Sequence, residues 1–145
     1  MSHPLSSRPQ WPTALLFSAL ALAACTTAPG SIGASQPALG DGEWRFLRID
    51  GKPPVDPAAR LTLQGERIGA NVGCNGMGGN WKVEDGRLIA GPLISTQMWC
   101  EGKMEQERAV SVLLSGNPEI TVSGNRMELR SAGHSAQLER AAPKR

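Results

Sequence analysis

The sequence predicts an α+β fold that is mostly β: an antiparallel sheet of hairpins packed by one amphipathic helix. Two observations predict the sheet, namely short segments in which apolar and polar residues alternate, and turn sequences at hairpin spacing between them. A period of two puts one face of each strand on a core and the other in water, as in antiparallel sheets. A third observation, one segment with helical spacing, predicts the helix.

The alternating segments lie within residues 43–140. They read EWRFLRI, RLTLQ, EITVS, RMELR and SAQLER, and NWKVEDGRL adds a further strand and hairpin. Between them lie the turn sequences QGER, EDGR, SGNR and SAGHS. Gly, Asn and Asp in these turns tolerate the positive φ that tight hairpins need, so we expect a series of antiparallel hairpins.

The helix is predicted over Lys103–Ser115. Gly116 and Pro118 mark its end. Apolar side chains recur on one side of it, at Met104, Val110, Leu113 and Leu114. This side is expected to lie on the sheet.

The N-terminus is typical of an exported lipoprotein. An apolar run from Trp11 to Cys25 has signal-peptide length and is shorter than the roughly 20 residues that span a bilayer. It ends in LAAC, which resembles the bacterial lipobox, so we predict a signal peptide over 1–24 and lipidation of Cys25. The alternative is an ordinary signal peptide with an incidental cysteine. Thr26 follows, and by resemblance to lipoprotein sorting this predicts the outer membrane, facing the periplasm.

The segment 25–42 is rich in Ala, Gly, Ser, Thr and Pro with almost no charge, which favours a flexible tether. A single small domain over 43–140 and a short tail over 141–145 complete the predicted organisation. The whole chain has 15 Lys and Arg against 13 Asp and Glu. Without a basic stripe or stacking aromatics, we predict no nucleic-acid partner.

The glycine-rich stretch NVGCNGMGGN, residues 71–80, is not a phosphate loop. It lacks the Gly-Lys-Ser/Thr ending and is followed by a strand pattern rather than a helix. We interpret it as a glycine-permitted bend between strands, in which Asn75 caps or bridges local backbone groups.

Cys74 and Cys100 form an even pair in an exported chain, which favours a disulfide over two separate buried thiols. A zinc site needs more soft ligands than these two cysteines and His134 supply. His134 is expected as a solvated side chain in a turn, and no nucleophile motif accompanies it. We therefore predict no enzyme activity, no metal and no cofactor. Core packing is the expectation for Trp44, Trp81 and Trp99.

Taken together, these motifs resemble the META domain family, in particular its HslJ-type bacterial lipoproteins. The resemblance rests on Trp44, GCNGMGG, Trp81, STQMWC and the pair Met104 and Glu107. The motif residues are Gly73, Cys74, Asn75, Gly79, Thr96, Met98, Cys100 and Glu107. Gly76 and Gln97 depart from it, because arginine is common in the family at both positions.

The resemblance implies a half-barrel, similar to a cracked barrel, crossed by the helix. It also implies an envelope protein linked to heat or drug stress, with no established catalysis or cofactor. The tether and the lack of a catalytic set favour action through contacts with an unidentified envelope protein partner or with the envelope itself. One alternative is a lipid carrier or pilot protein that holds an acyl ligand in an apolar groove, by analogy with a secretin pilot lipoprotein. A second alternative is a thiol-redox or metal protein that uses Cys74 and Cys100.

Overall fold

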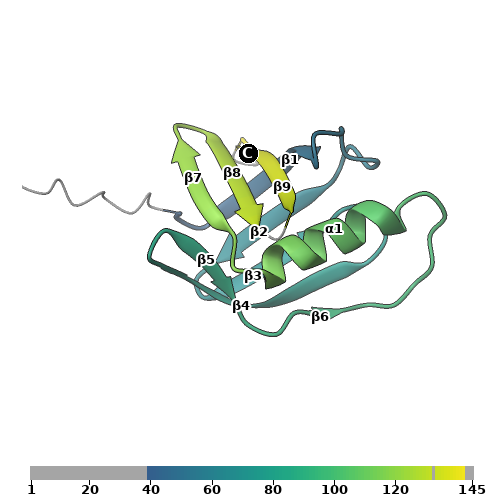
Figure 1. Cartoon of the computed structure of the whole chain (residues 1–145), viewed down its shortest axis with the longest axis horizontal. Helices are drawn as coiled ribbons and strands as arrows, with labels where there is room; N and C mark the ends of the chain where they lie inside the picture. Colours follow the sequence, from purple (N-terminus) through teal and green to yellow (C-terminus); the bar gives the residue numbers. More distant parts are fainter. Residues whose placement is uncertain (1–38, 132, 143–145) are drawn as a thin grey trace, which may run out of the picture. The chain divides into compact units, whose positions relative to one another are not determined.

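The computed structural model describes residues 39–131 and 133–142. In this part, nine strands and one helix follow one another along the chain (Figure 1). Their bounds are β1 Gly42–Ile49, β2 Arg60–Gln64, β3 Arg67–Asn71, β4 Gly76–Glu84, β5 Arg87–Ala90, β6 Ile94–Ser95, α1 Met104–Ser115, β7 Glu119–Ser123, β8 Arg126–Ser131 and β9 His134–Arg140. The expected signal peptide and lipidated Cys25 lie outside the described residues.

The strands form one antiparallel sheet that closes on itself. Its neighbours run β3-β2-β1-β9-β8-β7-β5-β4, and a further pairing joins β4 to β3, so these strands make a closed barrel. The seam between β5 and β7 is short, with the single residue pair Arg87 and Glu119. The mostly β fold with one helix is confirmed, and the predicted half-barrel goes on to full closure.

Strand β4 carries neighbours on both edges. Met77 pairs with Ala70 of β3 and also with Ser95 of β6, so β3 and β6 lie on opposite edges of β4. Strand β5 pairs with the second half of β4. The edge strand β6 therefore continues along β4 beyond β5, and within the described residues it pairs with no other strand.

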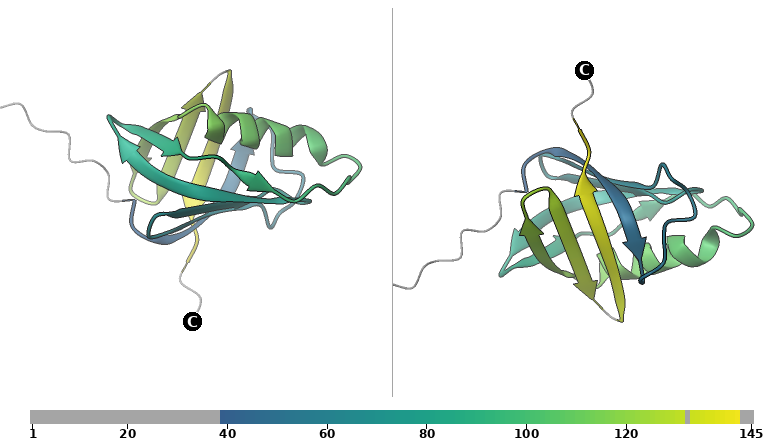
Figure 2. Two further views of the ribbon diagram at one scale, coloured as in Figure 1. Left: turned by 90° about the horizontal axis from the view of Figure 1, so that it is seen from below. Right: turned by 90° about the horizontal axis from the view of Figure 1, so that it is seen from above.

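Apolar side chains fill the inside of the barrel and the buried face of α1, which lies against the curved sheet (Figure 2). The clean alternation of Leu61 and Leu63 puts both side chains in this core. In β1 the buried residues are Trp44, Phe46 and then Ile49, because the pairing register with β9 shifts between Phe46 and Arg48. That bulge explains why the sequence pattern of β1 is only close to alternation.

The predicted helix is found, beginning one residue later, at Met104. Val110, Leu113 and Leu114 are buried as the pattern requires. The ordered fold also starts earlier than Glu43, because Leu39 packs against the core. The expected tether over 25–42 therefore ends within the domain.

The prediction of core packing is wrong for one tryptophan. Trp44 is buried, and Trp81 packs against the core while donating its Nε1–H to the Gly65 carbonyl at 2.9 Å. Trp99 is 81% exposed. In an extended segment neighbouring side chains point in opposite directions, and the adjacent Cys100 turns toward Cys74, so Trp99 turns to solvent.

Candidate functional site

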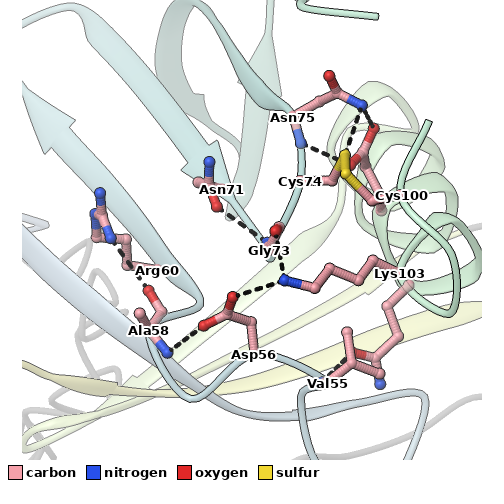
Figure 3. Close-up of polar contacts among 12 residues, drawn as sticks. Val55, Asp56, Ala58, Arg60, Asn71, Gly73, Cys74, Asn75, Cys100 and Lys103 are labelled. Carbon is pink, nitrogen blue, oxygen red and sulfur yellow. Dashed lines mark hydrogen bonds and ion pairs between the residues drawn. A yellow bond between two sulfur atoms is a disulfide. The ribbon is translucent and has the colours of Figure 1, made fainter. Parts of the chain in front are cut away.

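The Gly-Cys-Asn turn links β3 to β4 (Figure 3). Gly73 has φ +127°, a conformation that residues with side chains rarely adopt, and an added Cβ would lie 2.9 Å from the Cβ of Asp56. The Lys103 ammonium donates to the Gly73 carbonyl at 2.8 Å and to Asp56 Oδ2 at 3.2 Å. The turn is thereby tied to the β1–β2 loop and to the start of α1.

The side chain of Asn75 acts as a substitute for a neighbouring strand. It is 1% exposed. Its Oδ1 accepts the Met98 N–H and its Nδ2 donates to the Met98 carbonyl, both at 2.8 Å. A side-chain amide has the same donor and acceptor as a peptide group, so Asn75 extends the β4–β6 ladder to Met98 after the paired backbones have separated.

The other donor and acceptor positions of the Asn75 amide also have hydrogen-bond partners. Asn75 Oδ1 also accepts the hydroxyl of Thr96 at 2.8 Å, and Nδ2 donates to Glu107 Oε1 at 2.7 Å. Glu107 Oε2 accepts the Asn75 backbone N–H at 2.9 Å. Asn75 therefore connects β4 to helix α1 through buried hydrogen bonds and to the segment after β6 through partly buried ones.

Glu107 is a carboxylate at 8% exposure on α1. None of the ion pairs between described residues includes it. Its two oxygens are compensated instead by the two N–H donors of Asn75. A buried carboxylate is costly without such partners, so Glu107 and Asn75 depend on each other.

Cys74 and Cys100 form a disulfide, with their Cα atoms 6.0 Å apart. This is the pairing that the cysteine count favours. It fixes the chain just beyond Met98 to the turn that carries Asn75. Seven of the motif residues named from the sequence thus meet in one network: Gly73, Cys74, Asn75, Thr96, Met98, Cys100 and Glu107.

Gly79 lies outside this network. An added Cβ would stand 2.8 Å from the Pro92 carbonyl oxygen. Gly79 therefore permits the close approach of the 91–93 connection between β5 and β6, and its role is to let the edge strand run beside β4.

The network holds an exposed apolar surface. We call residues 94–100 the edge segment; in it Ile94 and Trp99 are each 81% exposed and Met98 is 60% exposed. Single exposed apolar side chains are ordinary, but this short, doubly tied segment exposes three of them, with the neighbours Met98 and Trp99 on opposite sides of it.

Two cavities lie beside α1 and share Met104, Arg108 and Val112. The first, the Trp99 cavity, has a volume of about 400 Å³, and its other lining residues are Asp50, Trp99, Glu105, Ala109 and His134. The second, the β6–α1 cleft, has a volume of about 210 Å³, and its other lining residues are Met77, Ser95, Glu107 and Ser111. Both are walled on one side by the helix and open to the surface.

His134 lies at the first position of β9, and its ring is paired rather than freely solvated. Its Nδ1 is 2.7 Å from Asp50 Oδ2, while Asp50 Oδ1 accepts the Ser135 N–H at 2.8 Å. Partial burial of Asp50 acts to raise its pKa, but the hydrogen bonds from Ser135 and His134 and nearby positive charge outweigh it, so the pKa is lowered. This pair links the end of β1 to the start of β9.

In residues 39–131 and 133–142, no group of three or more His, Cys, Asp and Glu side chains is placed to hold a metal ion. Over the same residues, the structure has no helix with the length and apolar character needed to cross a membrane.

The family model of the META domain matches residues 37–143. The chain belongs to the META domain family. The match covers the barrel, helix α1 and the whole Asn75 network, and it confirms the resemblance drawn from the Gly-Cys-Asn and Thr-x-Met-x-Cys motifs. The META domain is not an established enzyme family.

Two solved structures share the META domain fold of this chain. An NMR structure of a protein from Burkholderia xenovorans has a TM-score of 0.61 at 21% identity, covering 93% of this chain and 99% of that one. A second NMR structure has a TM-score of 0.60 at 20% identity, covering 68% of this chain and 87% of that one. No curated protein matches the chain.

The two departures from the META pattern lie at open positions. Gly76 has nothing within 4 Å of an added Cβ, and Gln97 is exposed on the edge segment. Sequence reasoning missed the tie from Lys103 to Asp56 and Gly73, and it named Glu107 as a motif residue without giving it a role. The signal that could have revealed its role was that Glu107 belongs to the same family motif as Asn75.

Proposed function

We propose that this chain is a non-enzymatic envelope lipoprotein, anchored by a lipid on Cys25 in the outer membrane and facing the periplasm. Its META domain contributes to tolerance of heat, drug or envelope stress through contacts with another protein or with the envelope. One observation carries the contact part of the proposal: Ile94, Met98 and Trp99 are exposed on a segment that the Asn75 network holds in place.

The composition of this surface supports contact rather than chemistry. Tryptophan and methionine are enriched at protein interfaces, and a rigid segment loses little entropy when it binds. The Cys74–Cys100 disulfide is consistent with an oxidising compartment such as the periplasm. The described ionisable residues include one close acid–histidine pair, Asp50 and His134, and no nucleophile is bonded to that pair.

The test is complementation of a deletion strain under heat and drug challenge. Wild type should restore survival, and a Met98→Ser/Trp99→Ser double variant should not, at equal protein level. Val55→Ser is the matched control, since Val55 is an apolar residue at 46% exposure that lines neither cavity beside α1. Full rescue by the double variant would overturn the contact proposal.

Anchoring is tested separately. The mass of the mature N-terminus should show a diacylated or triacylated Cys25, and membrane fractionation should place the protein with outer-membrane markers. Cys25→Ala should release it into the soluble periplasmic fraction. A soluble wild-type protein would contradict the anchor.

A lipid carrier is the second candidate, and the Trp99 cavity is what favours it. Its wall combines Trp99, Met104 and Val112, and its volume of about 400 Å³ lies in the roughly 300–1,000 Å³ range of ligand pockets. The inside of the barrel is occupied by core side chains, so an acyl chain would have to lie beside α1. Native mass spectrometry of the full chain mixed with palmitate tests this candidate. A complex with palmitate would support it, and free protein alone would remove it.

The third candidate, thiol-redox or metal chemistry at Cys74 and Cys100, has a simple test. Thiols are counted in the purified chain before and after treatment with a mild dithiol reductant, together with metal analysis. A bridge that resists the reductant in metal-free protein removes this candidate.

A further inference from the structure

We propose that the free edge of β6 binds an extended segment of another polypeptide, which adds to the sheet as a strand and places an acidic side chain beside Arg108. This inference rests on the proposed contact function and specifies the chemistry of the partner. It follows from the backbone groups at the edge, their rigidity, the adjacent cleft and its charge.

The edge offers unpaired backbone groups. Thr96 donates its N–H to the Gly76 carbonyl at 3.1 Å, and Ser95 faces Met77 across the pair. In an antiparallel pair the residues alternate between those whose N–H and C=O face the neighbour and those whose groups point away. The N–H and C=O of Ser95 therefore point away from β4, and those of Gln97 follow the same alternation.

Neither charge nor proline protects this edge, and its paired strand β6 is two residues long. Natural edge strands are commonly blunted by charge or proline, yet LISTQMWC, residues 93–100, has neither. Within the described residues, the sheet order ends at β6. An uncharged edge of this kind is a ready template for strand addition.

The edge is also held in shape before any partner arrives. Met98 is fixed by two hydrogen bonds to the Asn75 amide, and Cys100 is fixed by the disulfide. A partner strand would thus dock on a preformed edge, which lowers the entropy lost on binding.

The β6–α1 cleft can take one side chain of the added strand. Its volume of about 210 Å³ is below the roughly 300–1,000 Å³ of small-molecule pockets. Met77, Met104 and Val112 form the apolar part of its lining, beside the polar Ser95, Glu107, Arg108 and Ser111. Alternate side chains of a strand face the same side, so one apolar residue of the partner can enter the cleft while its backbone pairs with Ser95.

The charge of Arg108 indicates which kind of partner residue lies next to that apolar side chain. Arg108 lines the cleft, is exposed, and joins none of the ion pairs between described residues. A guanidinium binds carboxylates through paired hydrogen bonds, so the fitting partner segment has an aspartate or glutamate next to its apolar residue.

The test uses the full chain in detergent micelles and a phage-displayed library of random ten-residue peptides. Peptides are enriched on wild type and resynthesised for affinity measurement. Ser95→Pro removes the outward N–H without breaking a bond to β4, and proline is tolerated at such edge positions. Ser95→Ala is the matched control, since it keeps the N–H.

We expect acidic, β-prone peptides that bind Ser95→Pro about tenfold more weakly and Ser95→Ala equally well. Arg108→Glu should weaken the same peptides and favour lysine-containing ones. In amide hydrogen exchange, bound peptide should protect Ser95 and Gln97, whereas Thr96 is protected already. Equal affinity for Ser95→Pro, or no enriched peptide, would overturn the proposal.

Two further outcomes are decisive. Concentration-dependent dimerisation that Ser95→Pro abolishes, without any enriched peptide, would overturn the proposal in favour of a second copy of this chain as occupant. If peptide binding is insensitive to Ser95→Pro but the Met98/Trp99 variant still fails to restore stress survival, the edge proposal falls and the contact function stands.

Discussion

The carboxylate of Glu107 on α1 accepts both the backbone N–H and the side-chain N–H of Asn75, at 2.9 and 2.7 Å. Residues 32 positions apart in the chain thus form one buried hydrogen-bonded unit. Because Asn75 also binds Met98, the unit decides where the helix sits and where the edge segment runs.

Asn75→Asp is therefore expected to be more destabilising than its size suggests. It replaces an amide donor by a carboxylate beside Glu107, so two like charges meet in a buried place. We expect a loss of about 3 kcal/mol in the free energy of unfolding at neutral pH.

Acid should relieve part of this loss, because one proton shared by the two carboxyl groups restores a hydrogen bond. Urea unfolding at pH 7 and about pH 5 measures both effects, with wild type as the reference. A variant as stable as wild type at neutral pH would contradict the role of the Asn75–Glu107 pair.

Removing the disulfide should destabilise the domain and leave the fold intact. Cys74 and Cys100 are separated by 26 positions, and the chain-entropy model gives about 3.5 kcal/mol for a loop of this length. Cys74→Ser/Cys100→Ser should therefore lower the free energy of unfolding by about this amount in urea titration. Wild type in a strong dithiol reductant should show the same loss of unfolding free energy. If the loss in the double variant differs from the loss in reduced wild type, the serine side chains themselves strain the folded structure.

Two glycines should respond differently to alanine. At Gly73 the positive φ and the nearby Asp56 resist a Cβ, so Gly73→Ala should cost about 1–3 kcal/mol. Gly76 is in a strand with open space around it, so Gly76→Ala should change stability by about 0.5 kcal/mol or less. Thermal unfolding followed by circular dichroism compares them, and equal losses would contradict the steric account of Gly73.

Asp50 should make the domain sensitive to acid. Its folded pKa is lowered below 3.8, the ordinary value of an aspartate, so the stability it contributes is complete above that value and is lost as pH falls through the folded pKa. Asp50→Asn keeps a residue that tolerates the positive φ of 50° and removes the charge.

The variant should have a smaller loss of unfolding free energy than wild type between neutral and strongly acid pH. The difference should be about 1 kcal/mol or less, since the pair with His134 is partly exposed. Parallel unfolding titrations across this range measure it. Identical pH profiles would show that Asp50 does not contribute.

Local chemistry explains which parts of the fold could be predicted. The alternation of Leu61 with Leu63 and the helical spacing of Val110, Leu113 and Leu114 are local patterns, and they placed strands and helix correctly. Closure of the barrel could not be predicted from local patterns, because the β5–β7 seam rests on the pair Arg87 and Glu119 between distant segments.

The candidate site divides in the same way. Its residues could be named from the spacing of two motifs, but their roles depend on where α1 brings Glu107. The exposure of Trp99 was mispredicted because tryptophan usually packs in a core, and no sequence pattern shows that the neighbouring disulfide turns it outward.

The pairing of β1 with β9 brings the first and last strands of the domain together, from Trp44 opposite Arg140 to Ile49 opposite Ala136. Arg140 also stacks on the Trp44 ring, 4.4 Å from its centroid. The barrel therefore cannot close until the last residues of the domain have emerged, and such distant pairing makes folding slow. A ribosome that stops short of β9 would leave a chain with the Trp44 ring and two strand edges open to aggregation.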